Sequence, residues 1–335
     1  MPTIHAIATG GTIACTSGPD GAVPTESVQE LARSYSDVFE HVDVELDQLT
    51  QTPSSELTLE DLESLAHRIR TVANDVDGIV VFHGTDTIEE TAYYLDLVLE
   101  KDVPVVLTGA QRAHDQVSPD GPANVRGALN AASHEYIRDG VYVFFNDLLH
   151  AARPVTKRHS SNPNAYDSGN YGPVAERTPD GFWFYRRPES LSRTIPTREL
   201  TATVTVVPTS TDTSGDRIRD AVDRGIDGIV VDALGLGNVP GNMAAAVKDA
   251  IEMGVTVVVT TRCRNGIVSD VYGSDGGGKT LKEAGAVFAS NLSAHKARLK
   301  LLVALSTCDD DGDIRALFDP ERYTGHGYIR TKHDV

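Results

Sequence analysis

The chain has 335 residues, and 40% of them are hydrophobic, which predicts a globular protein with a sizeable core and about two domains of ordinary size. Its net charge of −18 argues against nucleic acid and anionic membrane surfaces as partners, because their phosphates would be repelled. The sequence contains no apolar run of about 18 residues, so it predicts no membrane span. The start of the chain lacks the segments of a signal peptide. We therefore expect a cytoplasmic protein.

The N-terminal half alternates short apolar runs with amphipathic stretches. Continuous Val/Ile runs without alternation are typical of strands that are covered on both faces. Strands that alternate with helices indicate a mostly parallel sheet. The predicted strands are 3–8, 77–84, 103–110 and 140–147, and the predicted helices are 57–75, 87–101 and 121–139.

The alternation breaks between residues 172 and 200, where only 181–187 reads as a hairpin strand and the rest reads as a linker. It resumes with predicted strands at 201–207, 227–237 and 255–262 and predicted helices at 214–225 and 241–254. The fold class we predict is α/β, with two doubly wound, mostly parallel-sheet domains. The larger N-terminal domain would cover residues 1–187, a linker 188–201, and the smaller C-terminal domain 202–335.

Two short motifs place a threonine directly after glycine at the end of a predicted strand, namely ATGGTIA at 8–14 and HGTDTIEE at 83–90. Ligands of open parallel sheets bind outside the carboxyl ends of the strands, so Thr12 and Thr85 could face one pocket, with Asp86 beside them. Each motif alone could simply close a turn. Asp86 or Thr87 could also cap the following helix, since both have the spacing of a capping box.

A threonine hydroxyl is a weak nucleophile and needs a base or a nearby cation. Lys157, in RPVTKRHSS, follows the predicted strand 140–147 and could reach the same edge of the sheet. A lysine near a carboxylate and a hydroxyl can relay a proton or orient both groups. The alternative is a solvated surface lysine.

One further motif, GSDGGGKT at 273–280, matches the phosphate-loop pattern. No partner strand that ends in a magnesium-binding aspartate can be assigned, which disfavours a nucleotide site. The histidines form no HExxH motif and no close cluster, so the sequence predicts no metal site.

The two threonine motifs resemble the signature motifs of the L-asparaginases of the bacterial type, which include asparaginase–glutaminases. The likeness extends over most of the chain. It covers 8–14, 83–93, 103–112, 118–129, 153–157, 170–174, 234–238 and 262–273.

This resemblance implies hydrolysis of L-asparagine to L-aspartate and ammonia without a cofactor. It implies Thr12 as the nucleophile, and Thr85, Asp86 and Lys157 as a second hydroxyl relay. For substrate binding it implies the backbone of Gly11 and Thr85 as oxyanion donors, Ser54 for the α-carboxylate, Asp86 for the α-ammonium group and Ala110 for the amide pocket.

The resemblance also implies a homo-oligomer, a dimer or tetramer, in which Asn238 and Tyr272 complete the site of a neighbouring subunit. The segment after the first motif would form a mobile lid, and Ala22 stands where the family usually carries a tyrosine. Two alternatives remain open. One is a non-catalytic amino-acid-binding protein on the same fold. The other is the amidase module of a tRNA-dependent amidotransferase, although Thr12 lies close to the start of the chain and the charge disfavours RNA.

The strong negative charge allows two interpretations, adaptation to high salt or an ordinary acidic cytosolic enzyme. Self-repulsion of a net charge of −18 lowers stability at low ionic strength, and salt screens it. If the protein is adapted to high salt, its melting temperature should rise steadily in a KCl series. A melting temperature that does not rise with KCl would exclude this interpretation.

Overall fold

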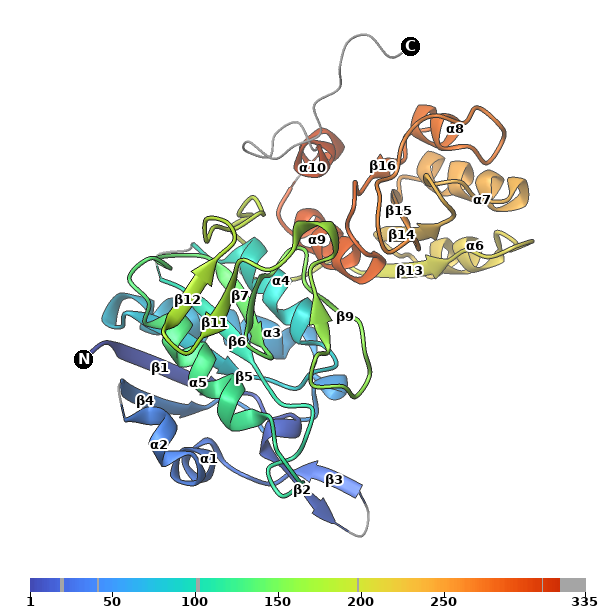
Figure 1. Ribbon diagram of the computed structural model, residues 1–335. Coiled ribbons are helices and arrows are strands. Elements are labelled where there is room, and N and C mark those ends of the chain that lie inside the picture. The colour runs from blue at the N-terminus through green and yellow to red at the C-terminus, as the bar shows by residue number, and fades with distance from the viewer. Residues whose placement is uncertain (19–20, 41, 101–102, 198, 309, 320–335) are drawn as a thin grey trace. The chain divides into compact units, whose positions relative to one another are not determined.

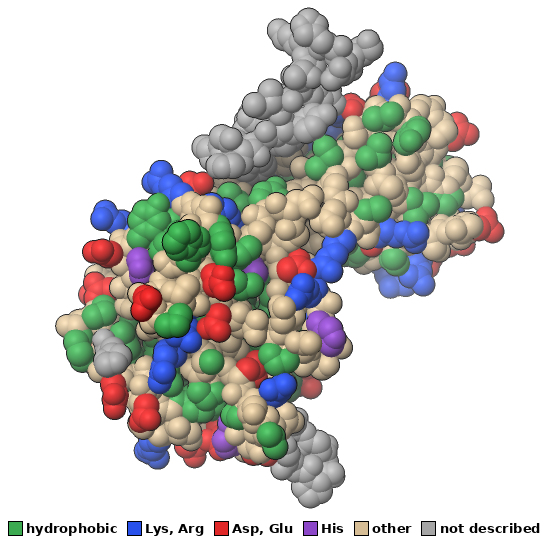
Figure 2. Space-filling view, in the orientation of Figure 1, with side chains coloured by type: hydrophobic (Ala, Val, Ile, Leu, Met, Phe, Trp, Pro, Cys, Tyr) green, Lys and Arg blue, Asp and Glu red, His purple; other side chains and the backbone are tan. Residues whose placement is uncertain are grey.

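The computed structural model describes residues 1–18, 21–40, 42–100, 103–197, 199–308 and 310–319. The chain divides into two compact units, Met1–Thr194 and Ile195–Val335, and each is described by itself (Figure 1). On the face shown in Figure 2, the acidic side chains are scattered among basic and apolar ones and do not gather into one patch.

An eight-stranded sheet forms the centre of the first unit. Its strands in chain order are β1 (Thr3–Ala8), β4 (Asp43–Gln48), β5 (Gly78–Phe82), β6 (Val105–Thr108), β7 (Val141–Phe145), β8 (Leu148–Ala151), β11 (Ala175–Thr178) and β12 (Gly181–Phe184). Across the sheet their order is β12-β11-β8-β7-β6-β5-β1-β4. Neighbours from β7 to β4 are parallel, whereas β8, β11 and β12 join as antiparallel strands. All five residues of β5 are buried, as expected of a strand covered on both faces.

Helices cover both faces of this sheet (Figure 1). They are α1 (Val28–Ser34), α2 (Ser36–Phe39), α3 (Leu59–Val72), α4 (Ile88–Val98) and α5 (Gly121–Ala132). Helices α1, α2 and α5 share a core with inward side chains of the sheet such as Ile4, Val80 and Phe144, while α3 and α4 lie on the opposite face. Capping boxes begin α1 at Ser27 and α3 at Thr58.

Short elements lie between the strands and helices of the first unit. Two small hairpins are formed by β2 (Cys15–Gly18) with β3 (Gly21–Pro24) and by β9 (Thr156–Lys157) with β10 (Tyr166–Asp167). The 3₁₀ turns are η1 (Thr12–Ala14), η2 (Ser54–Glu56), η3 (Ala73–Asp75) and η4 (Gly169–Tyr171). The hairpin β2–β3 occupies the lid segment, in which residues 19–20 and the side chain of Ala22 lie outside the described part of the chain.

The second unit holds a four-stranded parallel sheet in the order β13-β14-β15-β16. These strands are β13 (Val204–Pro208), β14 (Gly228–Ala233), β15 (Thr256–Thr261) and β16 (Val287–Phe288). The helices are α6 (Asp216–Asp223), α7 (Gly241–Glu252), α8 (Gly278–Glu283), α9 (Ala294–Leu305) and α10 (Asp311–Phe318). Residues of α6 and α7 share one core with the sheet, and α9 packs on β13, β14 and β15.

This architecture confirms the predicted fold class, and two predicted elements need correction. Residues 175–178 are not part of a linker, because they form β11 and extend the first sheet. The helix predicted at 121–139 ends at Ala132. Beyond its end, His134 and Tyr136 make edge-on ring contacts with Phe184 of β12, and these contacts replace further helical turns.

Helix α5 reaches the sheet through Gly127, which has no side chain. A Cβ atom at Gly127 would lie 1.9 Å from Cε1 of Phe144. Although alanine is favoured over glycine inside a helix by about 1 kcal/mol, we expect Gly127→Ala to lower the free energy of unfolding by about 1–3 kcal/mol through overpacking. Thermal melting would measure the change.

Gly241→Ala in α7 provides the control, because nothing lies within 4 Å of a Cβ atom there. Its melting temperature should equal or slightly exceed that of the unmodified chain, since alanine is the better helix former. A Gly127→Ala variant that melts as high as the Gly241→Ala variant would contradict this packing argument.

Candidate active site

The loops that follow β1 and β5 touch each other through two glycines. Gly11 has a φ of 85°, and a Cβ atom there would lie 2.2 Å from Cα of Gly84. Only glycine fits such a contact. Thr12 and Thr85 are the residues directly after these two glycines, so the contact brings both threonine-bearing loops together at the carboxyl ends of adjacent parallel strands.

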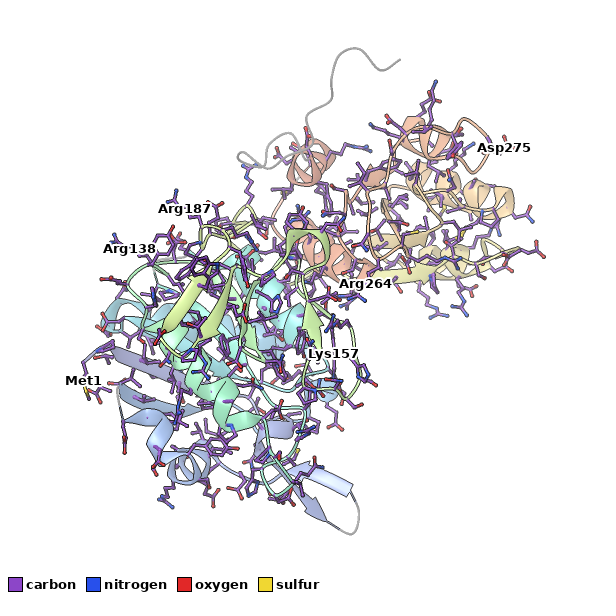
Figure 3. The ribbon with its side chains drawn as sticks, viewed as in Figure 1. Met1, Arg138, Lys157, Arg187, Arg264 and Asp275 are labelled. Atoms are coloured by element: carbon purple, nitrogen blue, oxygen red, sulfur yellow. The ribbon has the colours of Figure 1, made fainter. Side chains whose placement is uncertain are left out.

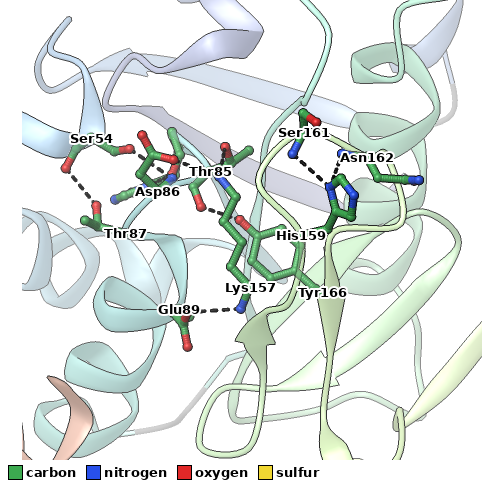
Figure 4. Close-up of polar contacts among 12 residues, drawn as sticks. Ser54, Thr85, Asp86, Thr87, Glu89, Lys157, His159, Ser161, Asn162 and Tyr166 are labelled. Carbon is green, nitrogen blue, oxygen red and sulfur yellow. Dashed lines mark hydrogen bonds and ion pairs between the residues drawn. The ribbon is translucent and has the colours of Figure 1, made fainter. Parts of the chain in front are cut away.

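Lys157 joins Thr85 and Asp86 through its side-chain amine (Figure 4). Its Nζ donates hydrogen bonds to Oγ1 of Thr85 at 2.9 Å and to Oδ1 of Asp86 at 2.7 Å. The lysine side chain is 13% exposed, whereas the Asp86 side chain is 67% exposed. A largely buried amine thus contacts one hydroxyl and one carboxylate that is open to solvent, and Lys157 is not a solvated surface residue.

The path of the chain to Lys157 differs from the sequence-based expectation. The strand β7 is followed by β8, which runs antiparallel to it, so Lys157 does not directly follow a strand that ends at the site. It lies instead on β9, the first strand of the small hairpin β9–β10 (Figure 3). The hairpin carries the amine to Thr85.

Ser54 and Thr87 complete the contacts around Asp86. Ser54 is buried, and its Oγ accepts a hydrogen bond from the backbone N–H of Asp86 at 3.3 Å. The Thr87 hydroxyl donates to the backbone carbonyl of Ser54 at 2.8 Å. The capping box that the spacing allowed does not form at the start of α4. Thr87 is the N-cap residue but makes no side-chain cap bond, and Asp86 binds Lys157.

Ala110 lies at the end of β6, beside the Thr85 loop. It is buried, and it follows Gly109, at which a Cβ atom would lie 3.6 Å from Cγ2 of Thr85. The Thr12 hydroxyl makes no hydrogen bond to another described residue. The first unit thus contains Gly11, Thr12, Ser54, Thr85, Asp86, Ala110 and Lys157.

Asn238 and Tyr272 belong to the second unit. Oδ1 of Asn238 accepts a hydrogen bond from the backbone N–H of Gly278 at 3.2 Å, and Tyr272 is 51% exposed. The glycines of the phosphate-loop-like motif serve packing here, because a Cβ atom at Gly276 or Gly277 would collide with a backbone carbonyl oxygen.

Three residues of the site were missed by the sequence analysis. The Tyr166 hydroxyl donates to the backbone carbonyl of Thr85 at 2.5 Å, and Oε1 of Glu89 accepts from the backbone N–H of Lys157 at 3.0 Å. His83 is fully buried beside Thr85. Glu89 and His83 stood inside the second motif. Nothing in the spacing of the motif indicated that Glu89 would bind the backbone of Lys157, which lies 68 positions away in the chain.

No group of three or more His, Cys, Asp or Glu side chains that could hold a metal ion occurs among the residues that the structure describes. Within the same residues, no helix combines the length and apolar character needed to cross a lipid bilayer.

Two family models match this chain, an asparaginase N-terminal model over residues 3–190 and a glutaminase/asparaginase C-terminal domain model over residues 203–318. The chain belongs to the asparaginase family. The resemblance found in the sequence motifs is thereby confirmed.

Individual members of the asparaginase family match over almost their full length. The chain is 36% identical to an L-asparaginase of Bacillus licheniformis over 90% of this chain and 94% of that protein. It is 38% identical to a probable L-asparaginase of Deinococcus radiodurans over 95% and 97%, respectively. A crystal structure of a probable cytoplasmic L-asparaginase from Campylobacter jejuni superposes with a TM-score of 0.85 at 29% identity and covers 95% of this chain and 99% of that one.

A second group within these matches consists of glutamyl-tRNA(Gln) amidotransferase subunits D. The subunit of Methanothermobacter thermautotrophicus is 31% identical over 92% of this chain, but the match covers only 73% of that protein. The asparaginases of B. licheniformis and D. radiodurans are thus more similar in sequence to this chain, and they are matched over more of their length.

His83, which lies beside Thr85, makes the stability of the folded chain depend on pH. Burial lowers its pKa from 6.5 to about 4, although the hydrogen bond to Gly84 raises it slightly. Nδ1 lies 2.8 Å from the carbonyl of Gly84 and must donate, so Nε2 accepts from the Thr91 hydroxyl at 2.9 Å. The folded protein therefore holds a neutral imidazole.

Because the unfolded chain binds this proton more readily, the contribution of His83 to stability is fully present above pH 6.5 and is lost as the pH falls towards 4. His83 alone should lower the free energy of unfolding by about 2 kcal/mol between pH 7 and pH 5. Urea denaturation of His83→Gln at both pH values should show a smaller loss than the unmodified chain. His159→Gln, on the exposed loop 158–164, should keep the original loss. Equal losses in all three proteins would contradict the role of His83.

Proposed function

We propose that the chain is an L-asparaginase, an amidohydrolase that converts L-asparagine to L-aspartate and ammonia. The observation that carries the proposal is the contact of Lys157 with Thr85 and Asp86, next to the loop that presents Thr12. The near full-length matches to proteins named L-asparaginase support the same reaction. The C. jejuni neighbour named cytoplasmic supports a cytoplasmic location.

In the proposed reaction, the Thr12 hydroxyl attacks the side-chain amide carbon of asparagine. The C–N bond then breaks, the nitrogen takes up a proton and leaves as ammonia, and an aspartyl ester of Thr12 remains. Water cleaves the ester to aspartate and restores the hydroxyl. The acyl-enzyme divides one difficult hydrolysis into two easier steps, and the Thr85–Lys157–Asp86 group moves the protons.

Charge development on the amide oxygen needs hydrogen-bond donors that are already in place. The proposed donors are the backbone N–H groups of Gly11 and Thr85, which lie on the two loops in contact. The glycine contact fixes these loops before substrate arrives, so little reorganisation is needed during the reaction.

Ser54, Asp86 and Ala110 are the proposed substrate-binding residues. Ser54 Oγ accepts from the backbone N–H of Asp86, which leaves the hydroxyl hydrogen available to the substrate α-carboxylate. The exposed carboxylate of Asp86 suits the α-ammonium group. The small side chain of Ala110 limits the pocket for the amide.

The two alternatives are less well supported. An amino-acid-binding protein without activity would not need a largely buried lysine against the Thr85 hydroxyl. An amidotransferase module would act on RNA, which a chain with a net charge of −18 repels. Ammonia release from free L-asparagine distinguishes asparaginase from both.

Thr12→Ala should abolish ammonia release from L-asparagine while the melting temperature stays within a few degrees, since a partly exposed hydroxyl contributes little to the core. Thr12→Ser is the matched control, because it keeps the hydroxyl and should retain measurable turnover. A Thr12→Ala protein with most of its turnover would contradict the role of Thr12 as nucleophile.

The site is proposed to be shared in a homodimer or tetramer, with Asn238 and Tyr272 supplied by a neighbouring copy. Thr12→Ala and Asn238→Ala should then complement each other when unfolded together and refolded as a mixture, because one hybrid site carries both original residues. Ammonia release from the mixture should exceed the sum of the separate variants. A mixture no more active than that sum would refute the shared site.

A further inference from the structure

Two hydroxyl groups hold the peptide between Thr85 and Asp86 from opposite sides. Its carbonyl oxygen accepts a hydrogen bond from Tyr166 at 2.5 Å, and its N–H donates to Oγ of Ser54 at 3.3 Å. The C=O and N–H groups of a trans peptide point in opposite directions and rotate as one plane. Loss of the hydrogen bond from Tyr166 would therefore let this peptide plane rotate and would disturb its hydrogen bond to Ser54.

Tyr166, on β10, is held in place by packing against the first sheet. It is 2% exposed, and its ring packs against Phe145 of β7 with the ring centroids 4.9 Å apart. Burial, with the nearby charges of Glu89 and Asp86, raises the pKa of Tyr166 far above its usual range. Its hydroxyl thus keeps its proton and acts as a donor to Thr85.

The hairpin that carries Tyr166 also carries Lys157. The two residues face each other across β9 and β10, and the backbone N–H of Lys157 is bound by the buried carboxylate of Glu89 at 3.0 Å. The hairpin is therefore tied to the 85–89 segment by four hydrogen bonds (Figure 4): two from Lys157 Nζ, one from the Lys157 backbone and one from the Tyr166 hydroxyl.

We propose that Tyr166 is a positioning residue for the amide hydrolysis. Its hydroxyl sets the orientation of the 85–86 peptide, and this orientation places the Thr85 hydroxyl against Lys157 and the Ser54 hydroxyl against the substrate. The inference rests on the proposed asparaginase function. In the proposed reaction, Tyr166 touches neither the substrate nor the reacting atoms.

Tyr166→Phe isolates the hydrogen bond, because phenylalanine keeps the ring and its contact with Phe145. With L-asparagine as substrate, kcat should fall about tenfold, equivalent to about 1.4 kcal/mol, and KM should rise. The control is Tyr142→Phe in β7, since the Tyr142 hydroxyl is buried and has no hydrogen-bond partner in the described part of the chain. This control should keep both kcat and KM.

A double-mutant cycle tests the route through the peptide plane. If Tyr166 and Ser54 act on one plane, the loss of kcat/KM in the double variant Tyr166→Phe/Ser54→Ala should be several-fold smaller than the product of the two single losses. If the two single losses of kcat/KM multiply in the double variant, Tyr166 does not act through the 85–86 peptide.

Two results for Tyr166→Phe alone would also overturn the proposal. One is a kcat and KM equal to those of the unmodified chain. The other is a lost turnover accompanied by a melting temperature more than about 10 °C lower, which indicates a general loss of stability.

The two proposals fail in different ways. An unmodified chain that releases no ammonia from L-asparagine contradicts the proposed function. An active unmodified chain together with an unaffected Tyr166→Phe variant contradicts the positioning role alone.

Discussion

The contact between the backbones of Gly11 and Gly84 is the constraint on which the site depends. A Cβ atom at Gly11 would lie 2.2 Å from Gly84, so side chains are excluded from both loops at this point. Adjacent parallel strands deliver the loops to one edge of the sheet, and the glycines let them touch. Thr12 and Thr85 follow directly, and their spacing is thereby set by backbone packing and not by flexible side chains.

The proposed reaction also requires a cation next to one of the two threonine hydroxyls. Lys157 comes from a hairpin far along the chain, and its amine is largely buried while Asp86 remains open to solvent. Because one partner of this ion pair is open to solvent, the pair adds little to stability, which supports the proposed catalytic role. Tyr166 and Glu89 hold the hairpin and the 85–89 segment together, which keeps the amine in place.

Much of the fold could be predicted because it depends on local patterns. Continuous apolar runs such as 78–82 indicated buried parallel strands, and glycine followed by threonine indicated strand ends. The missed features depend on contacts between distant segments: β11 pairs with β8, Glu89 binds the Lys157 backbone, and Tyr166 binds Thr85. Thr87 and Asp86 had the spacing of helix caps, but Ser54 and Lys157 offered partners that a local pattern does not contain.

A crystal structure of the Thr12→Ala variant with L-asparagine would test the central claim most directly. We expect the side-chain amide carbon to lie against residue 12, with the α-carboxylate on Ser54 and the α-ammonium group on Asp86. An asparagine molecule bound with its amide turned away from residue 12, or held without Ser54 and Asp86, would contradict it.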